Sequence, residues 1–367
     1  MINGHGDDAF RFGRPIRANF SSNVYAHVDQ EPLLAHLRSR LEVIRNYPEP
    51  EPYRLEQALS ARLGIDPASV CVTSGATEAI YLIAQAFRGG HSTVFQPAFN
   101  EYADACRLHG HTVVSCMLPG AGAGHSGKAE LSREGLSVPP SGWPEKAPDK
   151  PALVWICNPN NPTGGVIPKS ELKALISSLP ETFFVMDASY GFFTHEALLA
   201  PAEAVCYPNL IQLHSMTKRY AMPGLRLGYM TGPAALIERI RSCRMPWSVN
   251  ALAVEAGLFL TEYPDTAPID RDALFAETAR LRAQINALPG VEALPTQTHF
   301  FLCRLAAERA ADLKHYLAEN QGILIRDASN FEGLDARYFR IATQTPEEND
   351  ALVSALGAWL QKEEAQR

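Results

Sequence analysis

The stretch His214-Ser215-Met216-Thr217-Lys218, followed by Pro223-Gly224-Leu225-Arg226-Leu227-Gly228, is the most informative part of this chain. Lys218 lies three residues after Ser215, and Arg226 follows in an apolar turn that contains glycines. A lysine amine can form a Schiff base with an aldehyde, and a hydroxyl and a guanidinium can hold a phosphate. The stretch therefore predicts a site for a cofactor that is both an aldehyde and a phosphate.

Short apolar runs alternate with helical patterns through the middle of the chain. The runs predicted as strands are Val70–Thr73, Thr93–Gln96, Thr112–Cys116, Ala152–Cys157, Phe183–Met186 and Leu210–Leu213. Most are almost continuously apolar, as strands covered on both faces are. Helices are predicted at Ala76–Phe87, Tyr102–His109 and Glu171–Ser178. The alternation predicts an α/β fold with a mostly parallel central sheet and helices on both faces.

After about residue 245 the pattern changes to longer helices and a few short strands. Helices are predicted at Ala273–Leu288 and Ala306–Glu319, and strands at Phe300–Leu305 and Tyr338–Ala342. We expect a smaller α+β domain formed by the C-terminal part and the N-terminal segment. The predicted division is an N-terminal segment at 1–40 packing with the small domain, a large cofactor-binding domain at 41–245 and the small domain at 246–367.

Polar motifs follow the predicted strands where each strand ends, which is where α/β sheets bind ligands. Ser74-Gly75-Ala76-Thr77-Glu78 can bring free backbone N–H groups to an anion, and Phe99 can stack on a planar ring. An asparagine of Asn158–Gly165 can bond a ring oxygen, Asp187 can pair with a pyridinium nitrogen, and Tyr190 can donate to a phenolate. Taken singly, a helix cap or a core position would explain the first two motifs. Together they predict pyridoxal phosphate (PLP).

Two arginines near the C-terminus each interrupt an apolar run. Arg326 lies in Gly322-Ile323-Leu324-Ile325-Arg326-Asp327, and Arg340 in Tyr338-Phe339-Arg340-Ile341-Ala342. A buried guanidinium generally needs an anion. One arginine could hold a substrate carboxylate and the other a second anionic group, with structural salt bridges as the alternative.

Composition excludes several other classes of protein. A net charge of −7 without a basic cluster argues against nucleic acid. Seven scattered cysteines without a C-x-x-C pair predict neither disulfides nor a metal site, and favour the cytoplasm. Met1–Asp8 lacks the features of a signal peptide, and we expect no membrane partner. Gly122, Gly124 and Gly127 match a dinucleotide motif but lack its strand–turn–helix context.

Together these motifs resemble fold-type I PLP enzymes of the class I/II aminotransferase superfamily, over nearly the whole chain. The resemblance implies that Lys218 forms the Schiff base and that Asp187 pairs with the pyridinium nitrogen. The other implied cofactor contacts are Asn161 and Tyr190 at the ring oxygen, Phe99 on the ring face, and Ala76, Thr77, Ser215 and Arg226 at the phosphate.

The resemblance also implies contacts with substrate and with a second subunit. Arg340 would hold the substrate carboxylate, and Arg326, Asn23 and His5 are further candidates for binding substrate. Tyr47, in Asn46-Tyr47-Pro48, matches the tyrosine that reaches the cofactor phosphate of the neighbouring subunit in this family. A homodimer with shared active sites is therefore expected.

Two branches of the superfamily act on phosphorylated amines, namely L-threonine-O-3-phosphate decarboxylase of cobalamin biosynthesis and histidinol-phosphate aminotransferase. The stretches that are more similar to the decarboxylase are His5-Gly6, Tyr220–Tyr229, Met245–Ala253, Ile323–Arg326 and Ser329–Tyr338. The chain departs from that branch after Asn23, where the usual Asn-Pro is missing, and at Asp7 and Asp8, where Gly-Asn is usual. If this segment lay near a substrate phosphate, two carboxylates would repel it.

The resemblance implies decarboxylation of L-threonine O-3-phosphate to aminopropanol phosphate. The alternative is an aminotransferase acting on histidinol phosphate or on another amino acid. The reaction depends on which bond of the substrate Cα lies perpendicular to the cofactor ring, because that bond breaks. The sequence does not determine this orientation. A PLP-fold binding protein without turnover is a weaker rival, because Lys218 is present.

Overall fold

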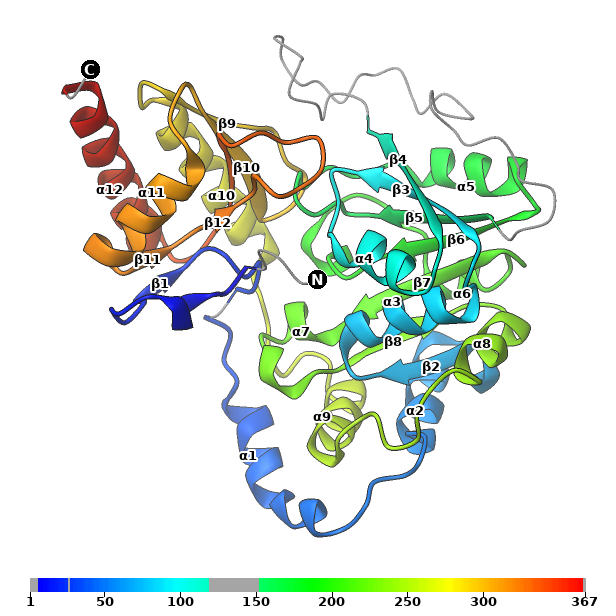
Figure 1. Ribbon diagram of the computed structural model, residues 1–367. Coiled ribbons are helices and arrows are strands. Elements are labelled where there is room, and N and C mark those ends of the chain that lie inside the picture. The colour runs from blue at the N-terminus through cyan, green and yellow to red at the C-terminus, as the bar shows by residue number, and fades with distance from the viewer. Residues whose placement is uncertain (1–5, 26, 119–151, 366–367) are drawn as a thin grey trace.

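The computed structural model describes residues 6–25, 27–118 and 152–365. This part of the chain forms a large sheet flanked by helices and, beside it, a smaller sheet with its own helices (Figure 1). His5 and the glycine motif at 122–127 lie outside the described residues. Among the described residues, no helix is long and apolar enough to cross a bilayer.

The large sheet has seven strands in the order β2-β8-β7-β6-β5-β3-β4. Their bounds are β2 Val70–Thr73, β3 His91–Gln96, β4 Thr112–Met117, β5 Ala152–Cys157, β6 Thr182–Asp187, β7 Leu210–Ser215 and β8 Gly228–Thr231. All neighbouring pairs are parallel except those of β8, which runs antiparallel to both β2 and β7. The six predicted strands and the mostly parallel sheet are confirmed, whereas β8 is an addition.

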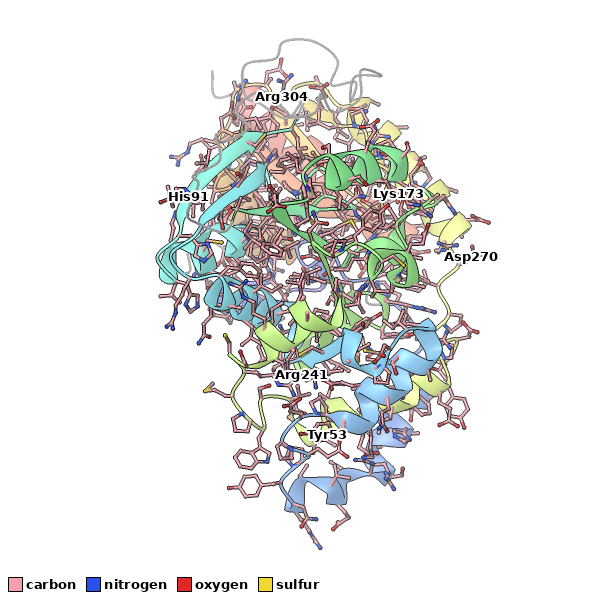
Figure 2. All side chains as sticks on the ribbon, turned by 90° about the vertical axis from the view of Figure 1, so that its right-hand side faces the viewer. Tyr53, His91, Lys173, Arg241, Asp270 and Arg304 are labelled. Carbon is pink, nitrogen blue, oxygen red and sulfur yellow. The ribbon has the colours of Figure 1, made fainter. Side chains whose placement is uncertain are left out.

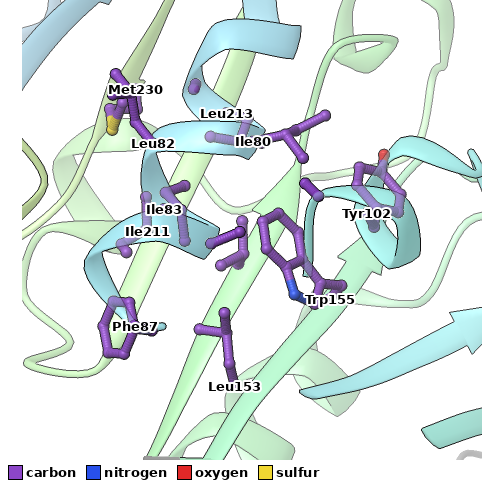
Figure 3. Packing of buried hydrophobic residues seen from close by; sticks show 14 of the residues in the cluster. Ile80, Leu82, Ile83, Phe87, Tyr102, Leu153, Trp155, Ile211, Leu213 and Met230 are labelled. Carbon is purple, nitrogen blue, oxygen red and sulfur yellow. The ribbon is translucent and has the colours of Figure 1, made fainter. Parts of the chain in front are cut away.

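Helices cover both faces of this sheet. On one face lie α3 (Gly75–Ala86), α4 (Glu101–Leu108) and α8 (Ala234–Arg241), and on the other α5 (Lys169–Ser178) and α6 (Pro201–Ala204). Consecutive residues of β5 serve opposite faces, since Leu153 and Trp155 pack under α3 while Val154 packs under α5. Figure 3 shows Ile80 of α3, and Phe87 directly after this helix, around Trp155 and Leu153. The continuous apolar character of the strands follows from this two-sided burial.

The smaller sheet is antiparallel, in the order β12-β13-β10-β9. Its strands are β9 (Val291–Ala293), β10 (Phe300–Leu305), β12 (Arg326–Asp327) and β13 (Tyr338–Ala342), packed with α10 (Arg271–Asn286), α11 (Ala310–Tyr316) and α12 (Pro346–Ala365). The predicted helix at Ala306–Glu319 begins later, at Ala310, and continues as a π-helical turn over Leu317–Gln321. Beside this sheet, β1 (Ala18–Asn19) pairs in parallel with β11 (Ile323–Leu324), so the N-terminal segment lies against the C-terminal part.

Three further helices lie beside the β2 edge of the large sheet, in the lower part of Figure 1, namely α1 (Glu31–Ser39), α2 (Tyr53–Leu63) and α9 (Ala251–Glu262). They share one buried cluster with β2, which includes Leu33, Leu55 and Ala253. Helices on both sides of the predicted limits at 40 and 245 thus join one core, and the domain limits themselves stay a prediction. On this side of the molecule Figure 2 shows Arg241, which donates to Glu51 at 2.8 Å just before α2.

Candidate active site

One pocket lies beyond the carboxyl ends of β2, β3, β5, β6 and β7. It brings together most of the side chains that the sequence predicted for a cofactor and a substrate. The predicted residues that line it are Ala76, Thr77, Phe99, Asn161, Asp187, Tyr190, Ser215, Lys218, Arg226, Arg326 and Arg340. Because five strand ends meet at one edge of the sheet, motifs far apart in sequence become neighbours.

Two predicted residues of the described chain do not line this pocket. Asn23 is fully buried behind it, between Ser22 and Val24, which do line it. Tyr47 is 86% exposed and lies outside the pocket, with its ring 5.5 Å from that of Trp247. Their predicted roles stay predictions.

Lys218 lies in α7 (Met216–Arg219), directly after β7, and its half-buried side chain lines the pocket. Its Nζ donates to the carbonyl oxygen of Ser22 at 3.2 Å. Burial lowers the pKa of Lys218 to about 8, and the positive charges of Arg340 and Arg226 contribute. Part of the amine is therefore neutral near physiological pH, as a nucleophile toward an aldehyde must be.

Asp187 ends β6 and is held by two donors. Its Oδ2 accepts from the hydroxyl of Tyr102 at 2.6 Å, and its Oδ1 from the backbone N–H of Ser189 at 2.9 Å. Tyr102 stacks on Trp155 with ring centroids 5.4 Å apart, and burial raises its pKa well above the ordinary value. Among the described residues no cation lies within ion-pair distance of Asp187. The carboxylate is thus oriented and available to a protonated ring nitrogen.

The part of the pocket beside the start of α3 suits a phosphate. α3 begins at Gly75, whose φ is +78°, and a side chain there would collide with the guanidinium of Arg226. At Gly228 a Cβ would lie 2.7 Å from the backbone nitrogen of Ala76. The two glycines therefore let Arg226 and β8 approach the first turn of α3, where free N–H groups can meet an anion.

The side chains around this pocket fit PLP. A half-buried amine, an oriented carboxylate and an anion cradle lie around one cavity, which Phe99 also lines. Burial raises the pKa of Tyr190 to about 12, so its hydroxyl keeps its proton and can donate to a ring oxygen. Within the described chain, no group of three or more His, Cys, Asp or Glu could hold a metal ion.

Arg340 and Arg326 are buried without a carboxylate partner. The Nη1 of Arg340 donates to Oδ1 of Asn161 and its Nη2 to the carbonyl of Ser21 at 2.5 Å, while its Nε has no partner. Arg326 donates to the carbonyl of Asp327 and to Oδ1 of Asn330, both at 2.7 Å. Burial lowers the pKa of each arginine to about 10. Neither forms an ion pair with the described acidic residues, so both are free for anionic ligands.

Some residues at the site escaped the sequence analysis. Tyr102 was assigned only to a helix, and its contact with Asp187 spans 85 residues of sequence. Gly6, Asp7, Ser21 and Ser22 of the N-terminal segment also line the pocket. In the sequence, the candidates His5 and Asn23 and the departures at Asp7 and Asp8 had pointed to this segment, but nothing had assigned a role to Ser21 or Ser22.

Comparison with known proteins identifies the family of the chain. Residues 16–356 match the family of class I and II aminotransferases. A threonine-phosphate decarboxylase of Salmonella typhimurium is 32% identical over 324 residues, which are 87% of this chain and 85% of that protein. A histidinol-phosphate aminotransferase of Desulfitobacterium hafniense is 29% identical over 316 residues, which are 85% and 83% of the two chains.

A solved structure, that of L-threonine-O-3-phosphate decarboxylase from Porphyromonas gingivalis, superposes with a TM-score of 0.83. It is 39% identical in sequence, and the match covers 94% of this chain and 99% of that one. The resemblance predicted from the motifs at the strand ends is thereby confirmed. The chain belongs to the aminotransferase class I and II family, whose model matches it over residues 16–356.

Proposed function

We propose that this enzyme uses PLP to decarboxylate L-threonine O-3-phosphate, giving aminopropanol phosphate for cobalamin biosynthesis. The observation that carries the proposal is the pair Arg326 and Arg340, two buried guanidiniums without carboxylate partners in the pocket of Lys218. A substrate with one carboxylate and one phosphate would neutralise both. Similarity to threonine-phosphate decarboxylases supports the same substrate.

The cofactor would be held by residues of the large sheet. Bound PLP supplies an electron sink for the bond that breaks at Cα of the substrate. Arg226, Ser215 and the first turn of α3 would bind its phosphate. Asp187, fixed by Tyr102, would keep the ring nitrogen protonated, and the Tyr190 hydroxyl would donate to the ring oxygen.

The chain's own residues would then orient the substrate and move one proton. Arg340 would hold the carboxylate, and the bond between Cα and that carboxylate breaks, so that CO2 leaves and the electron pair remains at Cα. The ammonium form of Lys218 would give a proton to Cα. A lysine whose pKa is lowered to about 8 by burial can exist in both protonation states near neutral pH. The net reaction consumes one proton and releases CO2.

Transamination of histidinol phosphate is the second candidate, because aminotransferases with that name are similarly close relatives. In that reaction Lys218 would remove the proton from Cα. Histidinol phosphate carries a phosphate but no carboxylate, so one of the two guanidiniums would stay buried without an anion. That cost favours the decarboxylase.

The test is release of CO2 from O-phospho-L-threonine by the PLP-loaded protein, with Lys218→Ala as the control. Stoichiometric aminopropanol phosphate that disappears in the control would support the proposal. If CO2 is absent but the PLP absorbance shifts on addition of histidinol phosphate and a keto acid is consumed, the enzyme is an aminotransferase. Arg340→Leu should raise the KM of the decarboxylase substrate by at least roughly ten-fold, since it removes one charge-assisted contact.

We further propose a homodimer with shared active sites. The residues around Tyr47 form an apolar surface, with Ile44 64% exposed, Met245 76% and Trp247 49%. A second copy of the chain would cover this surface and bring Tyr47 to its phosphate cradle. The cytoplasmic location stays a prediction.

A further inference from the structure

The loop after β12, at residues 328–334, forms part of the pocket wall and holds Arg326 in place. Phe331 of this loop is buried and lines the pocket. The guanidinium carbon of Arg326 lies 5.1 Å from the centre of the Phe331 ring, which is within cation–π range. Nη2 of Arg326 donates to Oδ1 of Asn330 at 2.7 Å. Two consecutive residues of one loop therefore fix the guanidinium.

The backbone of this loop is itself held at several points. Nδ2 of Asn100, which lines the pocket just before α4, donates to the carbonyl of Asn330 at 3.2 Å. The N–H of Phe331 donates to the carbonyl of Ala328 at 3.1 Å. These bonds tie Asn330 both to its own loop and to a residue beside the large sheet. The amide of Asn330 therefore meets Arg326 from a fixed direction.

The acceptors that contact the Arg326 guanidinium, Oδ1 of Asn330 and the backbone carbonyl of Asp327, are both neutral oxygens. A guanidinium only donates, so the atom of the Asn330 amide that faces it must be the oxygen. The charges of the Asp327 and Asp8 carboxylates reach Arg326, but within the described chain neither forms an ion pair with it. Asp8 is paired with Lys314 at 2.7 Å. Two neutral acceptors thus orient the guanidinium and leave its positive charge to a ligand.

We propose that Asn330 is a positioning residue that determines which charge the subsite at Arg326 accepts: its neutral amide aims the guanidinium into the pocket and leaves the guanidinium charge to an anionic group of the substrate. The inference rests on the proposed function, since that group would be the phosphate of L-threonine O-3-phosphate. Asn330→Asp would change the size of the side chain very little. Its carboxylate would, however, pair with Arg326 and repel the phosphate.

The test compares two ligands that cannot react because they lack an amino group, 3-phosphooxybutanoate and 3-hydroxybutanoate. Both carry the carboxylate that is proposed to bind Arg340, but only the first carries a phosphate. Calorimetry on the PLP-loaded protein gives the two dissociation constants, and their ratio measures the preference for phosphate. A general loss of folding, or of the contact with Arg340, would weaken both ligands and cancel in this ratio.

The wild type should bind the phosphate analogue roughly 100-fold more tightly than the hydroxyl analogue, as expected for a charge-assisted contact. Asn330→Asp should reduce this preference to within roughly three-fold, because the new carboxylate takes up the charge of Arg326. Asn330→Ala removes the acceptor without adding a charge and should keep a preference of roughly ten-fold. Asn320→Asp is the matched control and should keep the preference of the wild type, because Asn320 is exposed in the π-helical turn after α11 and lies outside the pocket.

The proposal would be overturned if Asn330→Asp kept the preference of the wild type, or if Asn330→Asp and Asn330→Ala lost the same amount. If the wild type itself bound both ligands equally, the subsite at Arg326 would not take an anion, and the proposed substrate would fail together with this inference. If the wild type preferred the phosphate analogue and Asn330→Asp left that preference intact, this inference alone would fail. Release of CO2 is measured separately, so the two failures are distinguishable.

Discussion

Replacement of Gly75 by alanine should weaken cofactor binding through two separable effects. The φ of +78° strains any side chain at this position, at a cost of about 1–2 kcal/mol in the free energy of unfolding. The added methyl group would also collide with the Arg226 guanidinium and displace it. One charge-assisted hydrogen bond to a phosphate is worth about 1.5–3 kcal/mol, so the Kd for PLP should rise roughly 10- to 100-fold.

Gly110→Ala is the matched control for this prediction. Its φ is +76°, but no atom lies within 4 Å of the position that a Cβ would occupy. The control should lose a similar free energy of unfolding in denaturant titrations and keep the PLP affinity of the wild type, measured by absorbance titration of the apoprotein. The reasoning would be refuted if Gly75→Ala bound PLP as tightly as the wild type, or if Gly110→Ala lost as much affinity.

Three further predictions concern the same site. The rate at which the apoprotein takes up PLP should rise with pH, with a midpoint near 8, because burial lowers the pKa of Lys218 to about 8. Arg340→Leu removes a positive charge near the amine and should therefore move this midpoint to higher pH. Stopped-flow absorbance measures the rate, and an unchanged midpoint in the variant would contradict the argument. Asp187→Asn should keep the circular dichroism spectrum of the wild type but lose at least ~100-fold in turnover rate. Tyr102→Phe removes only the 2.6 Å hydrogen bond to Asp187 and should lose roughly ten-fold. Equal losses in the two variants would argue against the supporting role of Tyr102. Mixing Lys218→Ala with Tyr47→Ala protein in equal amounts should restore about a quarter of wild-type activity, because half of the dimers would be mixed and each mixed dimer would have one intact site of its two. No recovery of activity would count against shared active sites.

Local sequence was sufficient for the cofactor side of the pocket because each motif directly follows a strand. The strands β5, β6 and β7 are parallel neighbours in one sheet, so their carboxyl ends lie at the same edge. The residues that follow these ends, namely Asn161, Tyr190 and Lys218, must therefore lie close together. The predicted placement therefore needed only the strand assignments, which the continuous apolar runs made clear.

Contacts between distant elements could not be predicted in the same way. The antiparallel strand β8 is short and follows directly on the Arg226 turn, without the apolar run and crossover helix that marked the other strands. The bond of Tyr102 to Asp187 depends on how α4 packs against β6, and the ion pair of Asp8 with Lys314 joins residues 306 positions apart. No periodicity or spacing along the chain encodes such pairs.

The pocket residues that we propose for the cofactor and for the substrate come from separate parts of the chain. Residues that fit the cofactor come from positions 75–228, whereas Arg326 and Arg340 come from the C-terminal part and Ser21, whose carbonyl accepts from Arg340, comes from the N-terminal segment. A mutational library confined to these terminal segments would change the residues proposed to bind substrate and would leave the residues proposed to bind the cofactor phosphate unchanged. Recombining such ends between related enzymes is accordingly a direct route to new amine chemistry on an unchanged central sheet.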